Sequence, residues 1–194
     1  MSFYSIAPFI KEYYPQYYSI VEYPADKCSQ FCKVDAQWGV FGNFGRTPLT
    51  VQGVVFKTSE QLFQLMKFKD TEAVKAVYAA GNPKMTAKKW EKVCRRDDWG
   101  TMIVDAMKFC LVTKYAQSEE FRAELEKSEG LFIVEDQTTF RKANPDTWGA
   151  KLQGDKYIGP NLLGRLLMEL RDNGTLEYSL PEDAFEFIEV LKNM

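Results

Sequence analysis

The sequence contains no histidine among its 194 residues. Ser-His-Asp and Cys-His catalysis both pass a proton through an imidazole, because its pKa lies near neutrality. Neither arrangement can form in this chain. Any acid–base chemistry must therefore use carboxylates, lysine, tyrosine or cysteine.

Cysteine is also scarce, and its four residues are too few and too loosely spaced for the disulfide framework of a secreted domain. Cys28 and Cys32 are spaced C-x3-C rather than C-x2-C, and no histidine is available to complete a zinc site. We therefore expect reduced thiols, no metal site and no cofactor. Cys110 fits the apolar face of a helix and is expected in the core.

Long apolar runs are missing: no stretch approaches the roughly 18 residues of a membrane-spanning helix, and no basic segment precedes an apolar run at the start. We expect neither a signal peptide nor a membrane span, and hence a cytoplasmic protein. With 25 basic and 27 acidic side chains the net charge is -2, so no overall field attracts nucleic acid or anionic lipid. This balance disfavours tight duplex binding but leaves room for a single modified nucleotide.

Apolar residues make up 45% of the chain, and folding at this length buries roughly 70% of the unfolded surface, enough for a substantial core. Strand signals are few, so we expect one mainly helical α+β domain with a small antiparallel β element. We place this domain at residues 37–194. Residues 1–36 are rich in tyrosine and proline and are expected to form an irregular or partly helical leader packed on the core.

Local signals predict the elements of this domain. Two apolar runs flank Gln52-Gly53, where the glycine can adopt a positive φ, which predicts a β-hairpin. Thr58 and Gln61 form a capping box that begins a helix over 59–69. Further helices are expected from Asp70, over 84–94, from Trp99 to Ala116, from Ser118 to Gly130, from Asn161 to Arg171 and after Pro181, with a strand at 131–135 and a long loop at 136–160.

Three polar residues on the helix over 59–69 form the first candidate site. Glu60, Gln64 and Lys67 are spaced i, i+4 and i+7, which places them within a stripe about 60° wide. Such a stripe is commonly a solvated face. The alternative is one wall of a ligand-binding cleft. Glu60 lies in the first helical turn, where the helix dipole favours the ionised carboxylate that an oxocarbenium-like transition state requires.

The loop before this helix carries further candidates. It combines backbone amides with the Asn43 amide, the Phe44 ring and the Arg46 guanidinium, which together suit a base and a phosphate. The competing interpretation is a tight turn in which Phe44 only packs.

Two tryptophans and an aspartate occupy other candidate positions. Trp99 begins the longest predicted helix, where a tryptophan is commonly part of the core, although it could also stack on a purine. Asp146 follows a proline and is either a turn residue or a second carboxylate near the bond that breaks. Trp148 and Gly149 follow it in the long loop. Spacing does not decide between these alternatives.

Five segments together resemble the NADAR superfamily of YbiA-like proteins. WGVFGNFGRTPLTVQGVVFKTSEQLFQLMKF is similar to the family's opening signature, in which an Asn-Phe loop and a hairpin precede Thr-x-Glu-x-x-x-Gln-x-x-Lys. RRDDWGTMIVDAMKFCLVTKYAQ, LFIVED, PDTWG and GPNLLGRLLMELR resemble its later helix, strand, Asp-x-x-Trp-Gly loop and last helix, in that order. The resemblance covers residues 38–172.

The resemblance implies an N-glycosidase or ADP-ribose-processing hydrolase that breaks the C1′–N bond of a phosphoribosyl- or ADP-ribosyl-linked base. It assigns catalysis to Glu60, Trp99 and Asp146. It implies a substrate pocket lined by Asn43, Phe44, Arg46, Gln64, Lys67, Trp148, Gly149 and Asn161. The implied partner is a ribosylated base, free or attached to nucleic acid, with no metal and no membrane.

Two departures from the family pattern keep a second hypothesis open. Gly42 replaces the serine that commonly precedes Asn-Phe, and Gln61 replaces the histidine that commonly follows the helix glutamate. The second change removes a titratable group. The alternatives are a non-catalytic NAD or ADP-ribose sensor, and a helical interaction module that docks through its aromatic leader.

Overall fold

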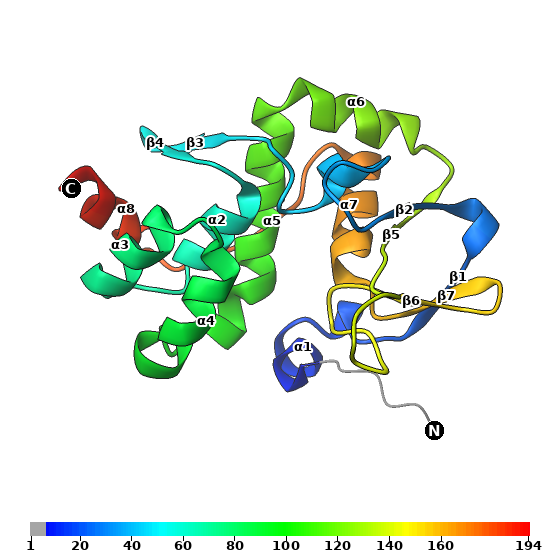
Figure 1. Ribbon diagram of the computed structural model, residues 1–194, viewed down its shortest axis with the longest axis horizontal. Coiled ribbons are helices and arrows are strands. Elements are labelled where there is room, and N and C mark those ends of the chain that lie inside the picture. The colour runs from blue at the N-terminus through cyan, green and yellow to red at the C-terminus, as the bar shows by residue number, and fades with distance from the viewer. Residues whose placement is uncertain (1–6) are drawn as a thin grey trace. The chain divides into compact units, whose positions relative to one another are not determined.

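The computed structural model describes residues 7–194 and has the expected mainly helical α+β character. The chain forms two compact units, labelled by their elements in Figure 1. The first unit comprises the residues up to 42 together with 119–176. The second comprises 43–118 and 177–194. Each is described by itself below.

The second unit begins with the predicted hairpin, in which β3 (Leu49–Val51) pairs antiparallel with β4 (Val54–Phe56). Gln52 and Gly53 form its two-residue turn with φ of 47° and 83°. Both residues lie in the left-handed region, as a tight hairpin turn requires. The hairpin prediction is therefore confirmed.

Helix α2 (Ser59–Leu65) begins at the predicted capping box. The Thr58 hydroxyl accepts a hydrogen bond from the Gln61 backbone N–H at 3.1 Å. The Gln61 side chain reaches back one residue further than the motif requires, and accepts from the Lys57 N–H at 2.7 Å. The helix ends at Leu65 rather than at residue 69, because Phe68 leaves the helix to form a β-bridge with Arg95.

The two helices that follow α2 are also capped by side chains. Asp70 accepts from the Ala73 N–H to begin α3 (Thr71–Ala79). Asn82 accepts from the Met85 N–H to begin α4 (Pro83–Cys94). Both boundaries lie within about one residue of their sequence predictions.

Helix α5 (Trp99–Gln117) is the longest helix and packs against α2 within the second unit (Figure 1). Asp98 stands at its N-cap but makes no side-chain capping bond. Its carboxylate instead accepts from the buried guanidinium of Arg96, with one N–O distance of 2.8 Å. Arg96 also pairs with Asp183, so an ion-pair network secures the chain that leads into α8 (Glu186–Lys192).

The first unit begins with α1 (Pro8–Tyr13), followed by β1 (Val21–Pro24) and β2 (Cys28–Phe31). The leader, expected to be irregular or partly helical, thus supplies two strands. β2 pairs parallel with β5 (Phe132–Glu135), which follows α6 (Glu119–Lys127). These four-residue strands carry little local signal, because they are stabilised by partners distant in sequence.

The segment predicted as one long loop, 136–160, contains a second hairpin. β6 (Lys151–Gln153) pairs antiparallel with β7 (Lys156–Gly159) through a turn that places Gly154 at φ 64°. β7 also pairs antiparallel with β1, giving the order β1-β7-β6. The loop prediction is therefore wrong after residue 150. Lysine and glycine are uncommon in strands, so Lys151, Lys156 and the glycines gave no strand signal here. The strands depend instead on pairing with β1.

Helix α7 (Leu162–Asn173) packs on β5 through an unusual junction at Asn161. Asn161 is fully buried with φ 48° and ψ 42°, and its side chain does not cap the helix as predicted. Its amide accepts from the Glu135 N–H at 3.0 Å and donates to the Ile133 carbonyl at 2.9 Å. The asparagine therefore joins the helix to the strand.

Among residues 7–194, no cluster of three or more cysteine or acidic side chains could hold a metal ion. The four cysteines are unpaired thiols, and Cys110 is buried as expected. No helix in the described part of the chain is long and apolar enough to cross a membrane.

Gly164 allows α7 to approach β5 closely. A Cβ at this position would lie 2.1 Å from the Ile133 carbonyl oxygen and about as close to the Asn161 amide. We expect Gly164→Ala to destabilise the protein by about 1–3 kcal/mol, although alanine normally favours a helix. Thermal unfolding would measure this as a lower Tm. The control is Gly81→Ala, since a Cβ there meets open space; equal Tm values for the two variants would contradict the close-packing argument.

Candidate functional site

The polar stripe formed by α2 and the turn after it is buried, not solvated. Glu60, Gln64 and Lys67 are only 4%, 3% and 8% exposed, respectively. Three neighbouring polar groups are expensive to bury unless each finds a partner. This excludes the interpretation of the stripe as a solvent-facing surface. The three side chains must instead be compensated by contacts within the fold.

Glu60 is held by both its backbone and its side chain. Its N–H donates to the Asn43 carbonyl at 2.8 Å, and its Oε1 accepts from Gln64 Nε2 at 2.7 Å. The Ser59 hydroxyl donates to the oxygens of Asn43, each at 3.2 Å, and Asn43 Nδ2 donates to the Met107 sulfur at 3.3 Å. The Asn-Phe loop is thus fixed directly onto the start of α2.

Burial raises the pKa of the Glu60 carboxyl above its usual value. The ammonium of Lys84, the hydrogen bond from Gln64 and the ammonium of Lys67 each oppose this rise. The sequence expectation considered only the helix N-terminus, which favours the ionised carboxylate, whereas burial shifts the Glu60 pKa in the opposite direction. A helix dipole contributes about 0.3–1 kcal/mol near the surface, which is less than the cost of burying a carboxylate.

Gln64 has one satisfied and one unsatisfied polar atom. Its Nε2 donates to Glu60, while its buried Oε1 has no hydrogen-bond partner. A buried acceptor without a donor costs about 1–3 kcal/mol, and few such atoms occur in native proteins. This atom points to a donor that is supplied from outside the chain.

Lys67 pairs with Glu91 of α4 and lies over two aromatic rings. Its Nζ is 5.5 Å from the centre of the Trp99 ring and 5.8 Å from that of Phe63. Burial lowers the pKa of this ammonium, and the hydrogen bond and charge of Glu91 oppose the shift. The aromatic faces and the carboxylate thus favour the charged form that burial disfavours.

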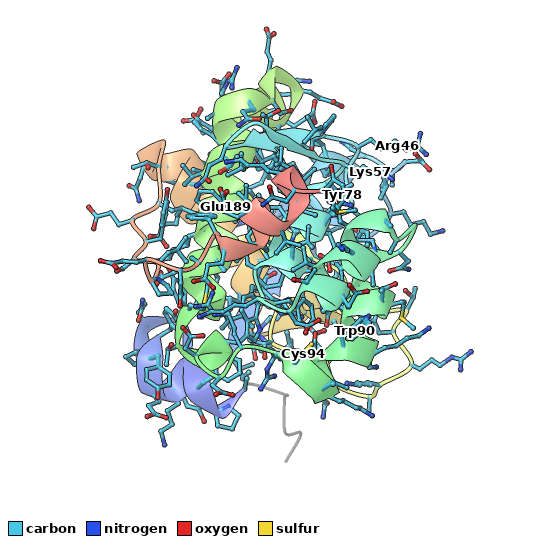
Figure 2. The ribbon with its side chains drawn as sticks, turned by 90° about the vertical axis from the view of Figure 1, so that its left-hand side faces the viewer. Arg46, Lys57, Tyr78, Trp90, Cys94 and Glu189 are labelled. Atoms are coloured by element: carbon cyan, nitrogen blue, oxygen red, sulfur yellow. The ribbon has the colours of Figure 1, made fainter. Side chains whose placement is uncertain are left out.

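Trp99 is 3% exposed, and its ring meets Phe63 edge-on at 5.2 Å between centroids. With Lys67 over its ring, little of the indole remains open for stacking on a purine. The structure thus favours the core interpretation of Trp99. By contrast, Phe44 and Arg46 are exposed on the loop before α2, where Figure 2 labels Arg46 at the outer edge of the unit.

Sequence reasoning missed three members of this cluster: Phe63, Lys84 and Glu91. Lys84 and Glu91 are seven residues apart on α4, which places both on one side of a helix that contacts α2. That spacing is a usable signal. It becomes informative only once α4 is known to pack beside α2.

Asp146 lies in the first unit and forms a reciprocal pair with Gln137. Gln137 Nε2 donates to Asp146 Oδ1 at 2.6 Å, and the Asp146 N–H donates to Gln137 Oε1 at 2.8 Å. The same Oδ1 accepts from the Trp148 N–H at 2.9 Å. Asp146 thus stabilises the turn that it lies in, and its half-buried carboxylate is held in a fixed position.

The loop after Asp146 closes the start of α7. The N–H groups of residues 161–163 donate to the carbonyls of residues 147–149 at 3.0–3.1 Å. Gly149 is required here, because a Cβ would lie 2.5 Å from the Glu135 carbonyl oxygen. These bonds leave Asn161 and Gly149 with structural tasks within the unit, while Trp148 is half-buried.

The fold has a solved counterpart. The NMR structure of the Escherichia coli protein YbiA matches it with a TM-score of 0.61 and 30% sequence identity, covering 76% of this chain and 84% of that one. The α+β fold is thus of the YbiA type. The chain belongs to the NADAR domain family, which it matches over residues 30–173.

Similar curated proteins include N-glycosidases and a riboflavin biosynthesis protein. N-glycosidase YbiA of Escherichia coli strain K12 is 30% identical over 154 residues, which cover 78% of this chain and 91% of that protein. An N-glycosidase of Nostoc punctiforme is 28% identical, covering 73% and 89%. A riboflavin biosynthesis protein of Vibrio vulnificus is 26% identical over 84% of this chain, which corresponds to 42% of its own length.

The buried carboxyl of Glu60 should lower the stability of the fold at neutral pH. Because its pKa is raised on folding, the folded protein binds more protons than the unfolded chain between the two pKa values. Stability from this group is therefore present in acid and lost as the pH rises through that window. We expect Glu60→Gln to raise Tm at pH 7, by roughly 2–4 °C for each kcal/mol recovered, and to change it little at pH 4.

Thermal unfolding of both proteins at pH 4, 5.5 and 7 measures this effect. Glu72→Gln is the matched control, since Glu72 also lies in a first helical turn but is exposed. A Tm difference for Glu60→Gln that is the same at all three pH values would refute the burial argument.

Proposed function

We propose that this chain is an N-glycosidase that hydrolyses the C1′–N bond of a phosphoribosyl- or ADP-ribosyl-linked base. The observation that carries the proposal is the buried cluster of Glu60, Gln64 and Lys67 on the family's own motif. Membership of the NADAR family, whose relatives are named N-glycosidases, gives the reaction class: a hydrolase acting on N-glycosyl bonds.

The proposed reaction needs no redox partner. As the C1′–N bond lengthens, its electron pair goes to the leaving nitrogen and positive charge spreads over the ribose ring. Water then adds its oxygen to C1′, and a proton passes to the nitrogen. The products are a ribose derivative with a C1′ hydroxyl and a base or amine with an N–H bond.

Glu60 is the residue to which we assign stabilisation of the ribose cation. A fixed anion in a site from which water is largely excluded acts strongly on charge that develops nearby. The flanking ammonium groups of Lys84 and Lys67 oppose the rise of the Glu60 pKa, and so favour the required carboxylate form. The Gln64 amide orients that carboxylate through its bond to Oε1.

The remaining assignments follow from what each side chain already contacts. We assign phosphate recognition to Arg46, because a guanidinium on an exposed loop can form two parallel hydrogen bonds with a phosphate. Trp99 acts by packing against Phe63 of α2 and by placing its ring beneath the Lys67 ammonium. Asp146, fixed by Gln137, is assigned to a ribose hydroxyl or to the attacking water, with Trp148 nearby in its loop.

The decisive experiment measures base release by the purified protein. The substrates are ADP-ribosylated guanine and a phosphoribosylaminopyrimidine, with the free base detected by chromatography. We expect turnover by the wild type and a loss of at least about a hundredfold in kcat for Glu60→Gln, because the fixed anion is removed. Asp146→Asn in the same assay tests the second carboxylate.

Glu72→Gln serves again as the exposed control and should retain full activity. Absence of base release from every ribosylated substrate would reject the proposal, as would wild-type rates in Glu60→Gln. Because that variant is expected to be at least as stable as the wild type at neutral pH, a loss of activity could not be attributed to unfolding.

The charge of Lys84 should influence the pH dependence of catalysis. It is the strongest of the contributions that oppose the rise of the Glu60 pKa. If the carboxylate is the active form, kcat/KM falls as the pH drops through this pKa. We expect Lys84→Met to move this acid limb to higher pH, in a pH–rate profile between pH 4 and 8.

Lys88→Met provides the comparison, because Lys88 is exposed on the same helix one turn later. It should leave the acid limb in place. An acid limb that is unmoved in Lys84→Met would contradict the role of Glu60 as the titrating group.

A non-catalytic sensor of NAD or ADP-ribose is the second candidate, and the environment of Gln61 favours it. Both polar atoms of this amide are hydrogen-bonded within the protein. Its oxygen accepts from the Lys57 N–H, and its nitrogen donates to the Tyr78 carbonyl at 2.8 Å. The position where the family commonly has histidine thus provides no titratable group. Calorimetric binding of ADP-ribose without turnover of any ribosylated substrate would establish the sensor.

A further inference from the structure

The orientation of the Gln64 amide is determined by Glu60. In the ionised form that the proposed function requires, Glu60 only accepts hydrogen bonds, so the Gln64 nitrogen faces it, with a bond of 2.7 Å. The Gln64 oxygen is thereby turned away from Glu60. Rotating the amide by 180° would place two acceptors against each other, so the position of the free acceptor is fixed.

No donor of the second unit satisfies this oxygen. Gln64 Oε1 is buried and lacks a hydrogen-bond partner. Lys67, in the turn that follows α2, has its ammonium engaged by Glu91 and held over the rings of Phe63 and Trp99. Asn43, on the other side of Glu60, donates to the Met107 sulfur.

The contrast with Gln61 shows that this is not a general property of α2. Gln61 is equally buried on the same helix, yet its oxygen accepts from the Lys57 N–H and its nitrogen donates to the Tyr78 carbonyl. The fold therefore satisfies one buried glutamine completely and leaves the other with one vacant acceptor beside the proposed catalytic carboxyl. An isolated acceptor of this kind costs about 1–3 kcal/mol until a ligand pairs with it.

We infer that Gln64 selects substrates in which the leaving nitrogen itself carries a hydrogen, by accepting a hydrogen bond from that N–H. The inference rests on the proposed function, which directs Glu60 towards C1′. The neighbouring amide then lies next to the atoms bonded to C1′, of which the leaving nitrogen is one. A ribosylated exocyclic amine has this N–H, whereas the glycosidic nitrogen of an ordinary nucleoside does not.

This selection works through a penalty as well as an attraction. A substrate without the N–H would leave the Gln64 oxygen buried and unpaired in the complex, where water is also displaced. Sites built to pair a polar substrate group reject analogues that lack the group, because their own polar atoms are then left unsatisfied. The selectivity is thus provided by a single acceptor atom, Gln64 Oε1.

The test uses a matched pair of 5-phosphoribosyl compounds, one of aniline and one of N-methylaniline, which differ by the N–H. We expect the wild type to favour the aniline compound in kcat/KM by at least about tenfold, which corresponds to 1.4 kcal/mol. In Gln64→Met, which has a similar length and no acceptor, the ratio should fall to about one. Gln61→Met is the matched control, and should keep the wild-type ratio even if it lowers Tm.

Each other outcome is informative. A preference that persists in Gln64→Met would show a steric effect of the methyl group and overturn the inference. Equal rates for the two compounds with the wild type would also overturn it, without any variant having to fold. If both compounds are hydrolysed without selection, the proposed function stands and only the inference fails.

Calorimetric binding of the same pair separates the inference from turnover. If the wild type hydrolyses neither compound nor any other ribosylated substrate, the proposed function fails. A tenfold tighter binding of the aniline compound that disappears in Gln64→Met would then still support the hydrogen bond. Equal affinities, or binding of neither compound, would reject it.

Discussion

The hydrogen bond between Glu60 and Gln64 is the interaction on which the rest of the site depends. It fixes the carboxylate, determines which way the amide faces and places an unpaired acceptor next to an acid. The Asn43 carbonyl secures the backbone of Glu60 from the preceding loop. A helix of seven residues can hold this arrangement only because all of its residues are buried by their neighbours.

Helix α4 provides the charges that make the buried arrangement tolerable. Lys84 counters the cost of burying the Glu60 carboxyl, and Glu91 does the same for the Lys67 ammonium. Side chains of α4 thus compensate the buried charges of Glu60 and Lys67. Phe63 and Trp99 pack against each other beside these charges. The site is therefore a property of the packed pair α2 and α4 rather than of the motif on α2 alone.

Features set by neighbouring residues could be predicted from the sequence, whereas those set by distant partners could not. The turn at Gln52-Gly53 and the cap at Thr58 depend on a few adjacent residues, and both were found. The hairpin of β6 and β7 depends on β1, more than a hundred residues earlier, and was missed. The upward shift of the Glu60 pKa does not follow from the sequence for the same reason, since burial comes from packing while the helix dipole is local.

The family match ends at residue 173, yet the second unit continues to use the chain beyond it. Asp183 shares the buried guanidinium of Arg96 with Asp98, and Phe187 meets Phe56 at 6.0 Å between ring centroids. An expression fragment trimmed to the recognisable domain would strip one counter-ion from Arg96 and open the hydrophobic interior behind the hairpin. The compact second unit thus includes residues that lie beyond the segment matched by the family.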